Sequence, residues 1–253
     1  MYENIIKAGI AIVTPNKKAN SGDFARYKKL KDMAKKNHTS FIYETNVGAG
    51  LPIIHTIQNL VLGGDKIIKI EAILSGTLSY IFNTFSESGN SFSEVVREAK
   101  AKGYAEPDPR DDLNGMDVAR KILILAREVG LKLELKQIKI NPILPDKCFK
   151  VSSIDNFFTE LKKLDSDFAE KKIQMQKNNQ ALRYIATLSD GKAEIRLQEV
   201  GQSQPFYQMS GSDNIISITT KRYCHTPLII KGHGAGAEVT AGGIFANILS
   251  IFR

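Results

Sequence analysis

Tryptophan is absent from this 253-residue chain, and cysteine occurs only twice, at Cys148 and Cys224. Two cysteines so far apart, without histidine or cysteine partners at ligand spacing, argue against a disulfide framework or a zinc site and are typical of a reducing cytosol. No apolar run approaches the roughly 20 residues of a membrane span, and Met1 is not followed by a signal-peptide pattern. We therefore expect a cytoplasmic protein that does not enter a membrane.

A complete dinucleotide fingerprint is also lacking. The glycine-rich stretch "GHGAGAEVTAGG" (232–243) begins well, with Gly234-x-Gly236, but has Val239 where the third glycine belongs. It is a weak motif that still allows close approach to a nucleotide. The four histidines form no Ser/His/Asp or metal-binding pattern.

The net charge of +8 raises the question of nucleic-acid binding. Much of the excess lies in 26–36 and 160–172, where lysines alternate with acidic and apolar residues at helical spacing. That pattern is typical of solvated helix faces, and no nucleic-acid-binding signature accompanies it. We expect no nucleic-acid partner, whereas a phosphate-bearing cofactor or an anionic substrate fits the charge.

The order of elements predicts an α/β protein. A strand within 10–15, an amphipathic helix at 23–36 and a strand at 40–45 form a βαβ unit with parallel strands, the end of a larger doubly wound sheet. Helices and strands then mix, with Pro52 at a first helical position and a Ser91/Glu94 capping box. Further segments predict strands at 65–74 and after 180, a hairpin turn at Asp190–Gly191, helix over 155–177 and a closing helix at 240–252.

The stretch "GYAEPDPRDDLNGMDVARKILILA" (103–126) brings unusual charge to the start of an apolar helix. Its two prolines predict an extended or turning loop over 104–113. Asp117 and Lys121 stand four apart, share a helix face, and are expected to enter the interior together. A loop cap with a buried ion pair is one interpretation. The remaining carboxylates, Glu106, Asp108, Asp111 and Asp112, favour the other, a polar pocket for a small polar substrate.

"TPNKKA" (14–19) follows a parallel strand, where ligand crevices of open α/β sheets lie. Lys17 is there either a solvated loop residue or a group placed to polarise a carbonyl. Two lysines converging on one site would lower each other's pKa, which would favour proton transfer near neutral pH.

Together, "VTPNKKANS", "YETNVGAGLPII", "ILSGTLSYIFN", "GYAEPDPRDDLNGMDVARK" and "GHGAGAEVTAGGIFA" resemble homoserine dehydrogenase, most closely the dehydrogenase half of bifunctional aspartokinase/homoserine dehydrogenase. The resemblance implies reduction of aspartate 4-semialdehyde to homoserine with NADPH or NADH, in threonine and methionine biosynthesis. It also implies a homodimer or higher homo-oligomer. The implied fold is the C-terminal remnant of a Rossmann nucleotide-binding domain (1–45), a mixed α/β substrate and dimerisation domain (46–235), and a C-terminal helix returning to the nucleotide-binding domain (236–253).

The resemblance also implies residue roles. Lys121, Lys17 and Asp117 correspond to the catalytic group, and Lys17 with Gly236 would face the cofactor. Substrate contacts are implied for Gly76, Thr77, Glu106 and Asp112. A structural, sodium-like monovalent cation would be held by Glu44, Val47, Ala49 and Leu51.

The chain departs from the family in one respect. Only about a dozen residues precede "TPNK", so we expect an N-terminally truncated chain that lacks the first, pyrophosphate-binding half of the Rossmann domain. The alternative interpretation is therefore a non-catalytic fragment that retains only dimerisation and substrate binding.

Overall fold

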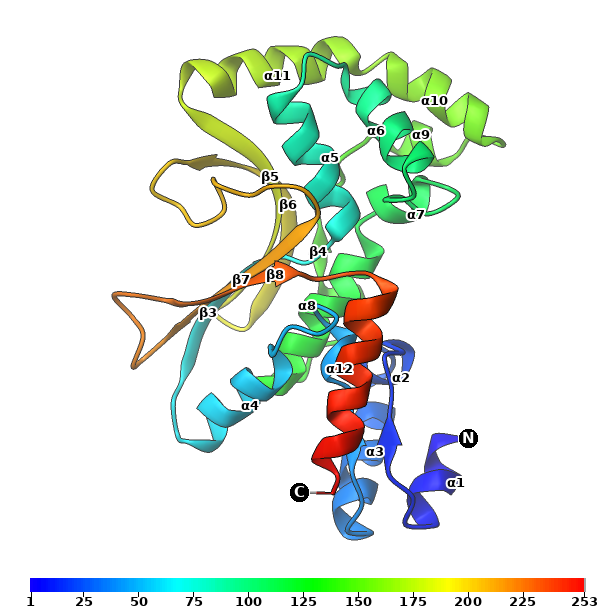
Figure 1. Cartoon of the computed structure of the whole chain (residues 1–253), viewed down its shortest axis with the longest axis vertical. Helices are drawn as coiled ribbons and strands as arrows, with labels where there is room; N and C mark the ends of the chain where they lie inside the picture. The colour runs from blue at the N-terminus through cyan, green and yellow to red at the C-terminus, as the bar shows by residue number, and fades with distance from the viewer. Residues whose placement is uncertain (253) are drawn as a thin grey trace.

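The computed structural model describes residues 1–252 and contains two sheets (Figure 1). The smaller sheet pairs β1 (Ile12–Val13) with β2 (Phe41–Ile42) in parallel, and α3 (Phe24–Lys36) connects them. α3 begins at Asp23, whose carboxylate accepts the N–H of Arg26 and caps the helix. The predicted parallel βαβ unit is confirmed. Two short helices accompany it, α1 (Tyr2–Lys7) and α2 (Lys18–Ser21).

The larger sheet has six strands in the order β4-β6-β5-β3-β7-β8, antiparallel except for the β4–β6 pair. The expected hairpin joins β5 to β6 through Asp190 and Gly191, which both have positive φ, at 51° and 73°. The strands are β3 (Ile67–Ile73), β4 (Lys139–Ile140), β5 (Gln180–Ser189), β6 (Lys192–Gly201), β7 (Asp213–Thr220) and β8 (Leu228–His233).

Helices cover one face of this sheet (Figure 1), and the main core lies between them and the strands. The predicted capping box of Ser91 and Glu94 starts α6 (Phe92–Ala101). The remaining helices are α4 (Ile54–Leu62), α5 (Gly76–Glu87), α7 (Arg110–Leu113), α8 (Met116–Glu128), α9 (Asp146–Phe149), α10 (Ile154–Lys162), α11 (Asp165–Lys177) and α12 (Ala237–Ser250), with 3-10 turns η1 (Glu44–Asn46) and η2 (Leu135–Gln137). Within residues 1–252, none of the helices has the length and apolarity needed to span a membrane.

Two local predictions were wrong in detail. α4 starts at Ile54 and not at Pro52, because the Glu44 carboxylate caps it from outside. The 104–113 segment is not entirely extended, since α7 forms one helical turn directly after Pro109. A proline is tolerated there because the first N–H groups of a helix need no partner within it.

α8 is the element that joins the two parts of the molecule, and it contacts α2, α4, β5 and β6. Its apolar run, 122–126, is completely buried. The helix starts at Gly115, where φ is +73° and a Cβ atom would lie 2.5 Å from the hydroxyl of Tyr184. Only glycine combines that backbone conformation with so close an approach.

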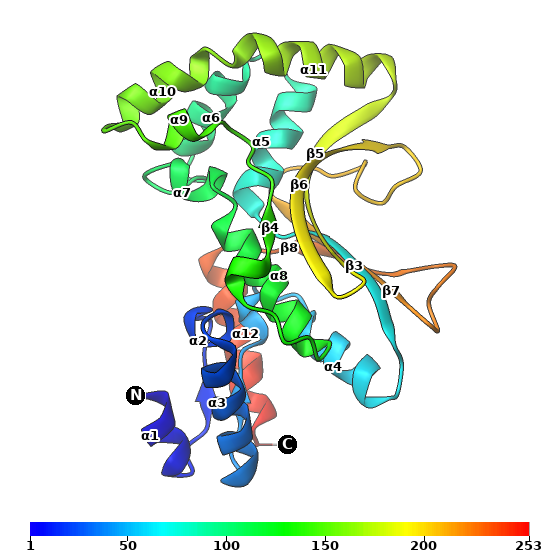
Figure 2. The ribbon, with the colours of Figure 1, turned by 180° about the vertical axis from the view of Figure 1, so that it is seen from behind.

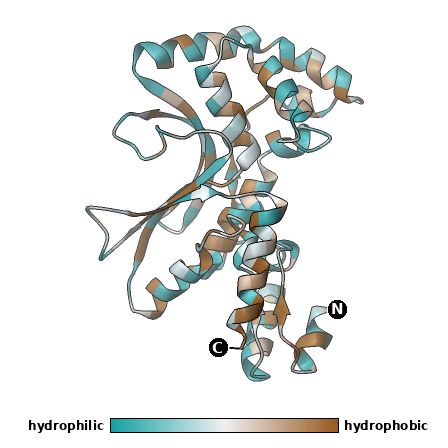
Figure 3. Cartoon of the chain, in the orientation of Figure 1, coloured by the Kyte–Doolittle hydropathy of each residue, from teal (hydrophilic) through white to brown (hydrophobic). Residues whose placement is uncertain are grey.

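α12 returns from the large sheet to the smaller one (Figure 2), where it contacts β1 and η1. A Cβ atom at Gly243 would lie 2.7 Å from Thr45 Cγ2, so the helix packs backbone-close on the 45–50 loop. Its far half is strongly apolar (Figure 3), with Phe245, Ile248 and Leu249 exposed.

Candidate active site

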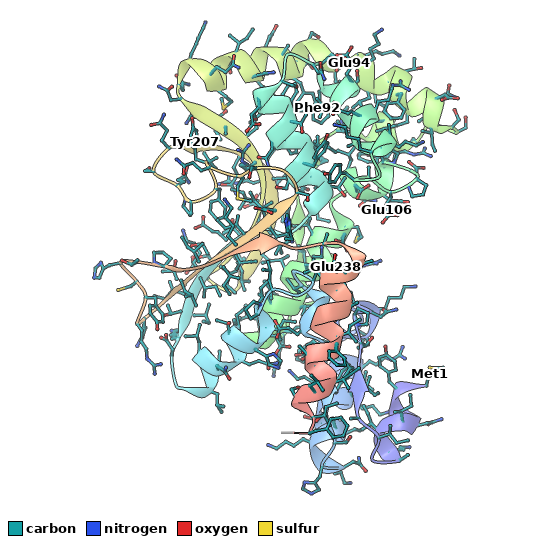
Figure 4. All side chains as sticks on the ribbon, in the orientation of Figure 1. Met1, Phe92, Glu94, Glu106, Tyr207 and Glu238 are labelled. Atoms are coloured by element: carbon teal, nitrogen blue, oxygen red, sulfur yellow. The ribbon has the colours of Figure 1, made fainter. Side chains whose placement is uncertain are left out.

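A cleft of about 580 Å³ opens where the segments after β1, β3 and β8 meet the charged stretch that leads into α8. Figure 4 labels Glu106, which lines the cleft before α7, and Glu238, which lies in the first turn of α12, two residues after the lining residue Gly236. Every residue predicted for catalysis, substrate or cofactor lines this cleft: Lys17, Gly76, Thr77, Glu106, Asp112, Asp117, Lys121 and Gly236.

One half of the cleft is a lysine–carboxylate–lysine bridge. Asp117 Oδ1 lies 3.2 Å from Lys17 Nζ, and Asp117 Oδ2 lies 2.8 Å from Lys121 Nζ. Lys121 also donates to the carbonyl of Leu74, at 2.7 Å. The expectation that the ion pair enters the interior as a unit was wrong for Asp117, whose side chain is 43% exposed while Lys121 is buried. The ammonium points inward from α8 and the carboxylate stays at the mouth.

Burial lowers the pKa of Lys121, and the charge of Lys17 acts in the same direction, whereas Asp117 opposes both. The expected repulsion between the lysines therefore contributes, but burial is the larger cause. For Asp117, burial would raise the pKa, but the two ammonium groups outweigh it and the pKa is lowered. Asp117 thus stays ionised beside a lysine that can release a proton more readily than an exposed one.

The other half of the cleft carries carboxylates without cations. Within residues 1–252, Glu106, Asp111 and Asp112 have no cationic group within 4.0 Å. Burial raises the pKa of Asp112, and the charges of Glu106 and Asp117 raise it further. Asp112 Oδ2 accepts the N–H of Glu106 at 2.8 Å, which holds the two acidic residues in one place. A cationic ligand group would relieve this repulsion.

Asp108, in the same stretch, has a structural role instead. It pairs with Arg110 at 2.5 Å, and Arg110 also donates to the carbonyl of Val151. The pair fixes the loop before α7 and does not line the cleft. Of the carboxylates that favoured a polar pocket, Glu106, Asp111 and Asp112 therefore line the cleft, whereas Asp108 stabilises the loop before α7.

Further cleft residues escaped the sequence analysis. Ser75 caps α5 by accepting the N–H of Leu78, and Thr77 donates to the carbonyl of Tyr104 at 2.7 Å. The Tyr104 ring stacks on Tyr80, with centroids 4.1 Å apart. The fold adds three more wall residues. Gly103 and Ala235 lie in the stretches 103–126 and 232–243 but were given no role, and Ser212 carries no local signal.

The four residues predicted to hold a cation lie in η1 and the loop before α4, and they do not line the cleft. Glu44 accepts the N–H groups of Ile53, Ile54 and His55, and its Oε2 lies 2.7 Å from Nδ1 of His55. The Leu51 carbonyl accepts the N–H of Ile53. The carbonyls of Val47 and Ala49 accept no hydrogen bond within residues 1–252. This part of the chain holds no cluster of three or more histidine, cysteine or acidic ligands for a metal.

The fold and the cleft together define a class: α/β proteins in which a βαβ unit of nucleotide-binding type leads into a cleft lined by lysines and carboxylates. A family model described as homoserine dehydrogenase matches residues 52–249, and one described as homoserine dehydrogenase, NAD binding domain, matches residues 1–44. The chain belongs to the homoserine dehydrogenase family, which is a family of oxidoreductases.

Relatives and solved structures agree with this assignment. The chain is 50% identical to bifunctional aspartokinase/homoserine dehydrogenase 2, chloroplastic, of Zea mays, covering 99% of this chain and 27% of that protein. It is 42% identical to homoserine dehydrogenase of Schizosaccharomyces pombe, covering 99% and 68% respectively. A hyperthermophilic archaeal homoserine dehydrogenase in complex with NADPH aligns with a TM-score of 0.73 and 26% identity, covering 99% and 66%. The chain thus spans about a quarter of the maize protein.

Proposed function

We propose that this chain carries the substrate site of a homoserine dehydrogenase, which interconverts aspartate 4-semialdehyde and homoserine with NAD(P)H. The observation that supports this most directly is the division of the cleft into a lysine half and a half of unpaired carboxylates. An amino acid with a reactive carbonyl matches both halves, since its ammonium suits the carboxylates and its carbonyl oxygen suits the lysines.

In this mechanism Glu106 and Asp112 bind the substrate ammonium, while Gly76 and Thr77 contact the substrate at the start of α5. Lys121 has three N–H groups, and the Leu74 carbonyl and Asp117 use two of them. The third donates to the substrate oxygen, stabilises the developing alkoxide and transfers a proton to it, so that C=O becomes CH–OH. Lys17 acts at the same oxygen from the other side of Asp117.

The cofactor, when bound, supplies the hydride that reduces the aldehyde carbon. Gly236 is suited to its nicotinamide end, because φ is +116° and the space that a Cβ atom would occupy has nothing within 4 Å. Lys17 lies across the same cleft. A glycine-rich phosphate loop is not among these residues, so this chain fits only one end of the dinucleotide. NAD and NADP are equally compatible with it.

A monovalent, sodium-like cation at the η1 loop is the second part of the proposal. The free carbonyls of Val47 and Ala49 are the hard, neutral oxygen ligands that such an ion prefers. Glu44 and Leu51 would complete the ligand set, although both already accept hydrogen bonds from the 53–55 segment. Isothermal titration with NaCl against choline chloride tests this, and Glu44→Gln should weaken any sodium-specific heat.

We also propose that two copies of the chain associate through the sheet face opposite the helices. That face is only partly covered, by the 202–212 segment, and retains a groove of about 600 Å³ beside the exposed Ile229. The free Cys148 and Cys224 suit a reducing compartment, for which we propose the cytoplasm.

Homoserine binding and turnover are measured separately to test the main proposal. Calorimetry should detect homoserine binding to the chain, and Lys121→Ala should lower NAD(P)⁺ reduction about 100-fold or more where turnover is measurable. Binding without turnover would support the alternative, a non-catalytic fragment that retains only dimerisation and substrate binding. Failure to bind homoserine or aspartate semialdehyde analogues contradicts both.

A further inference from the structure

We infer that Arg127 is a positioning residue that holds Lys17 in the cleft. The inference rests on the proposed function, because it concerns a lysine assigned to that reaction. Arg127 lies in the last turn of α8 and does not line the cleft. Its contacts nevertheless end on the short helix that carries Lys17 at its start.

The Arg127 side chain is fully buried, and each of its three guanidinium nitrogens donates to at least one acceptor. Nη1 donates to the carbonyl of Asn20 at 2.8 Å, and Nη2 donates to the carbonyl of Gly22 at 2.7 Å. The same group also binds the carbonyl of Leu133 and the carboxylate of Glu134. Arg127 thus satisfies carbonyls at the end of α2, which would otherwise be left without partners.

α2 is a single helical turn, so holding its C-terminal end also restricts the backbone of Lys17 at its start. The N–H groups of Asn20 and Ser21 both donate to the carbonyl of Lys17, at 3.1 and 2.8 Å, and the Ser21 hydroxyl donates to it as well. Asn20 is also fixed from the other side, since its amide donates to Asn46 Oδ1 at 2.8 Å. The backbone of Lys17 therefore has little freedom once the end of α2 is held.

Both ends of α8 are linked to the segment formed by Lys17 and α2. Asp117, in its first turn, pairs with the Lys17 ammonium, and Arg127, ten residues later, binds the end of α2. Ten residues of α-helix span about 15 Å, which is longer than α2. The long side chains of Lys17 and Arg127 make up the difference. The two helices are in contact. One rigid helix therefore carries Lys121 and sets the place of Lys17.

A planar guanidinium suits this task better than an ammonium. Five N–H donors in a fixed plane reach carbonyls on two sides of the group, whereas a lysine would offer three donors at one point. The neighbouring residue, Glu128, provides a comparison within the same turn. It is buried and accepts from Tyr27, Tyr43 and Gln58, so it also ties α8 to the N-terminal region, but within residues 1–252 it makes no hydrogen bond with α2.

The first experiment observes Lys17 directly in the unliganded chain labelled with [ε-13C]lysine. Lys17→Arg and Lys121→Arg variants assign the two ε-CH₂ resonances. Arg127→Met should move the Lys17 resonance to the position of exposed lysines, and Arg127→Lys should move it part of the way. Glu128→Gln, the matched control, should leave it unchanged. An unchanged Lys17 resonance in a folded Arg127 variant overturns the inference, as does an equal shift in Glu128→Gln.

The second experiment is a double-mutant cycle on homoserine oxidation. Arg127→Lys should lower kcat about tenfold with little change in the KM for homoserine, and should lower it less than about twofold in a Lys17→Ala background. Additive losses mean that Arg127 does not act through Lys17. A wild-type chain without turnover would count against the proposed function, whereas the NMR result would still decide the role of Arg127.

Discussion

At the scale of single residues, the buried ammonium group of Lys121 serves the proposed reaction but lowers the stability of the fold. An ammonium group held out of water is costly, and its ion pair with Asp117 offsets only part of that cost. The spacing of four residues in the sequence predicted the pair, because i and i+4 share a helix face. It could not show that the Leu74 carbonyl, 47 residues away in sequence, would complete the site.

Lys121→Met should therefore stabilise the protein at neutral pH, by about 1 kcal/mol, although it removes the proposed proton donor. The pKa of Lys121 is lowered by folding, so the unfolded chain binds more protons between the folded pKa and the ordinary value near 10.5. Wild-type stability recovers as pH rises through that window, and the advantage of the variant should shrink. Urea unfolding of the wild type and of Lys121→Met at pH 7 and pH 9.5 measures the difference in stability and its change with pH. A variant less stable than the wild type at pH 7 contradicts the prediction.

Asp112 leads to a prediction about pH and substrate affinity. Because its pKa is raised, protonation begins at a higher pH than for an ordinary aspartate, and a neutral Asp112 cannot pair with the substrate ammonium. Homoserine affinity should fall as pH decreases through the pKa of Asp112. Asp112→Asn should weaken binding about 10- to 100-fold and flatten this acid dependence. Asp108→Asn is the control in calorimetric titrations, since Asp108 pairs with Arg110 outside the cleft.

The elements show where local patterns are sufficient and where they are not. Alternating apolar residues and Asp190–Gly191 predicted the β5–β6 hairpin, since both signals lie within a few residues. The helical turn of α7 was missed because its sequence is dominated by Pro107, Pro109 and charge, and it is stabilised by the Asp108–Arg110 contacts. The start of α4 was misplaced because the residue that caps it, Glu44, lies ten residues before its first residue, Ile54.

The start of α8 supports a prediction about a glycine. Gly115→Ala should destabilise the protein by about 3 kcal/mol, because it adds a clash with Tyr184 to the cost of a positive φ. Gly130→Ala, just beyond the other end of α8, has φ +89° but open space, so it should cost only about 1 kcal/mol. Thermal unfolding compares the stabilities of the two variants. Adding Tyr184→Phe to Gly115→Ala should recover part of the lost stability. Equal losses at Gly115 and Gly130 would show that the clash is not felt.

At the scale of the whole molecule, the sequence predicted an α/β chain with a parallel βαβ unit followed by mixed elements, and this is confirmed. It did not predict that β3 would lie between β5 and β7, because strand order depends on pairings more than a hundred residues apart. The convergence of the site is of the same kind. Thr77 and Tyr104 are 27 residues apart in the sequence and Lys17 and Asp117 are 100 apart, so no local pattern predicts that they meet.

The partly covered face of the large sheet leads to the last prediction. Ile229 lies in β8 opposite Ser217 and is 47% exposed beside the groove on that face. If two copies associate there, Ile229→Lys places a charge in an apolar contact and should raise the dimer dissociation constant about tenfold or more. Ile10→Lys is the matched control, since Ile10 is 57% exposed in the N-terminal region. Sedimentation velocity over a concentration series measures the equilibrium. A dimer unaffected by Ile229→Lys, or weakened equally by Ile10→Lys, would place the interface elsewhere.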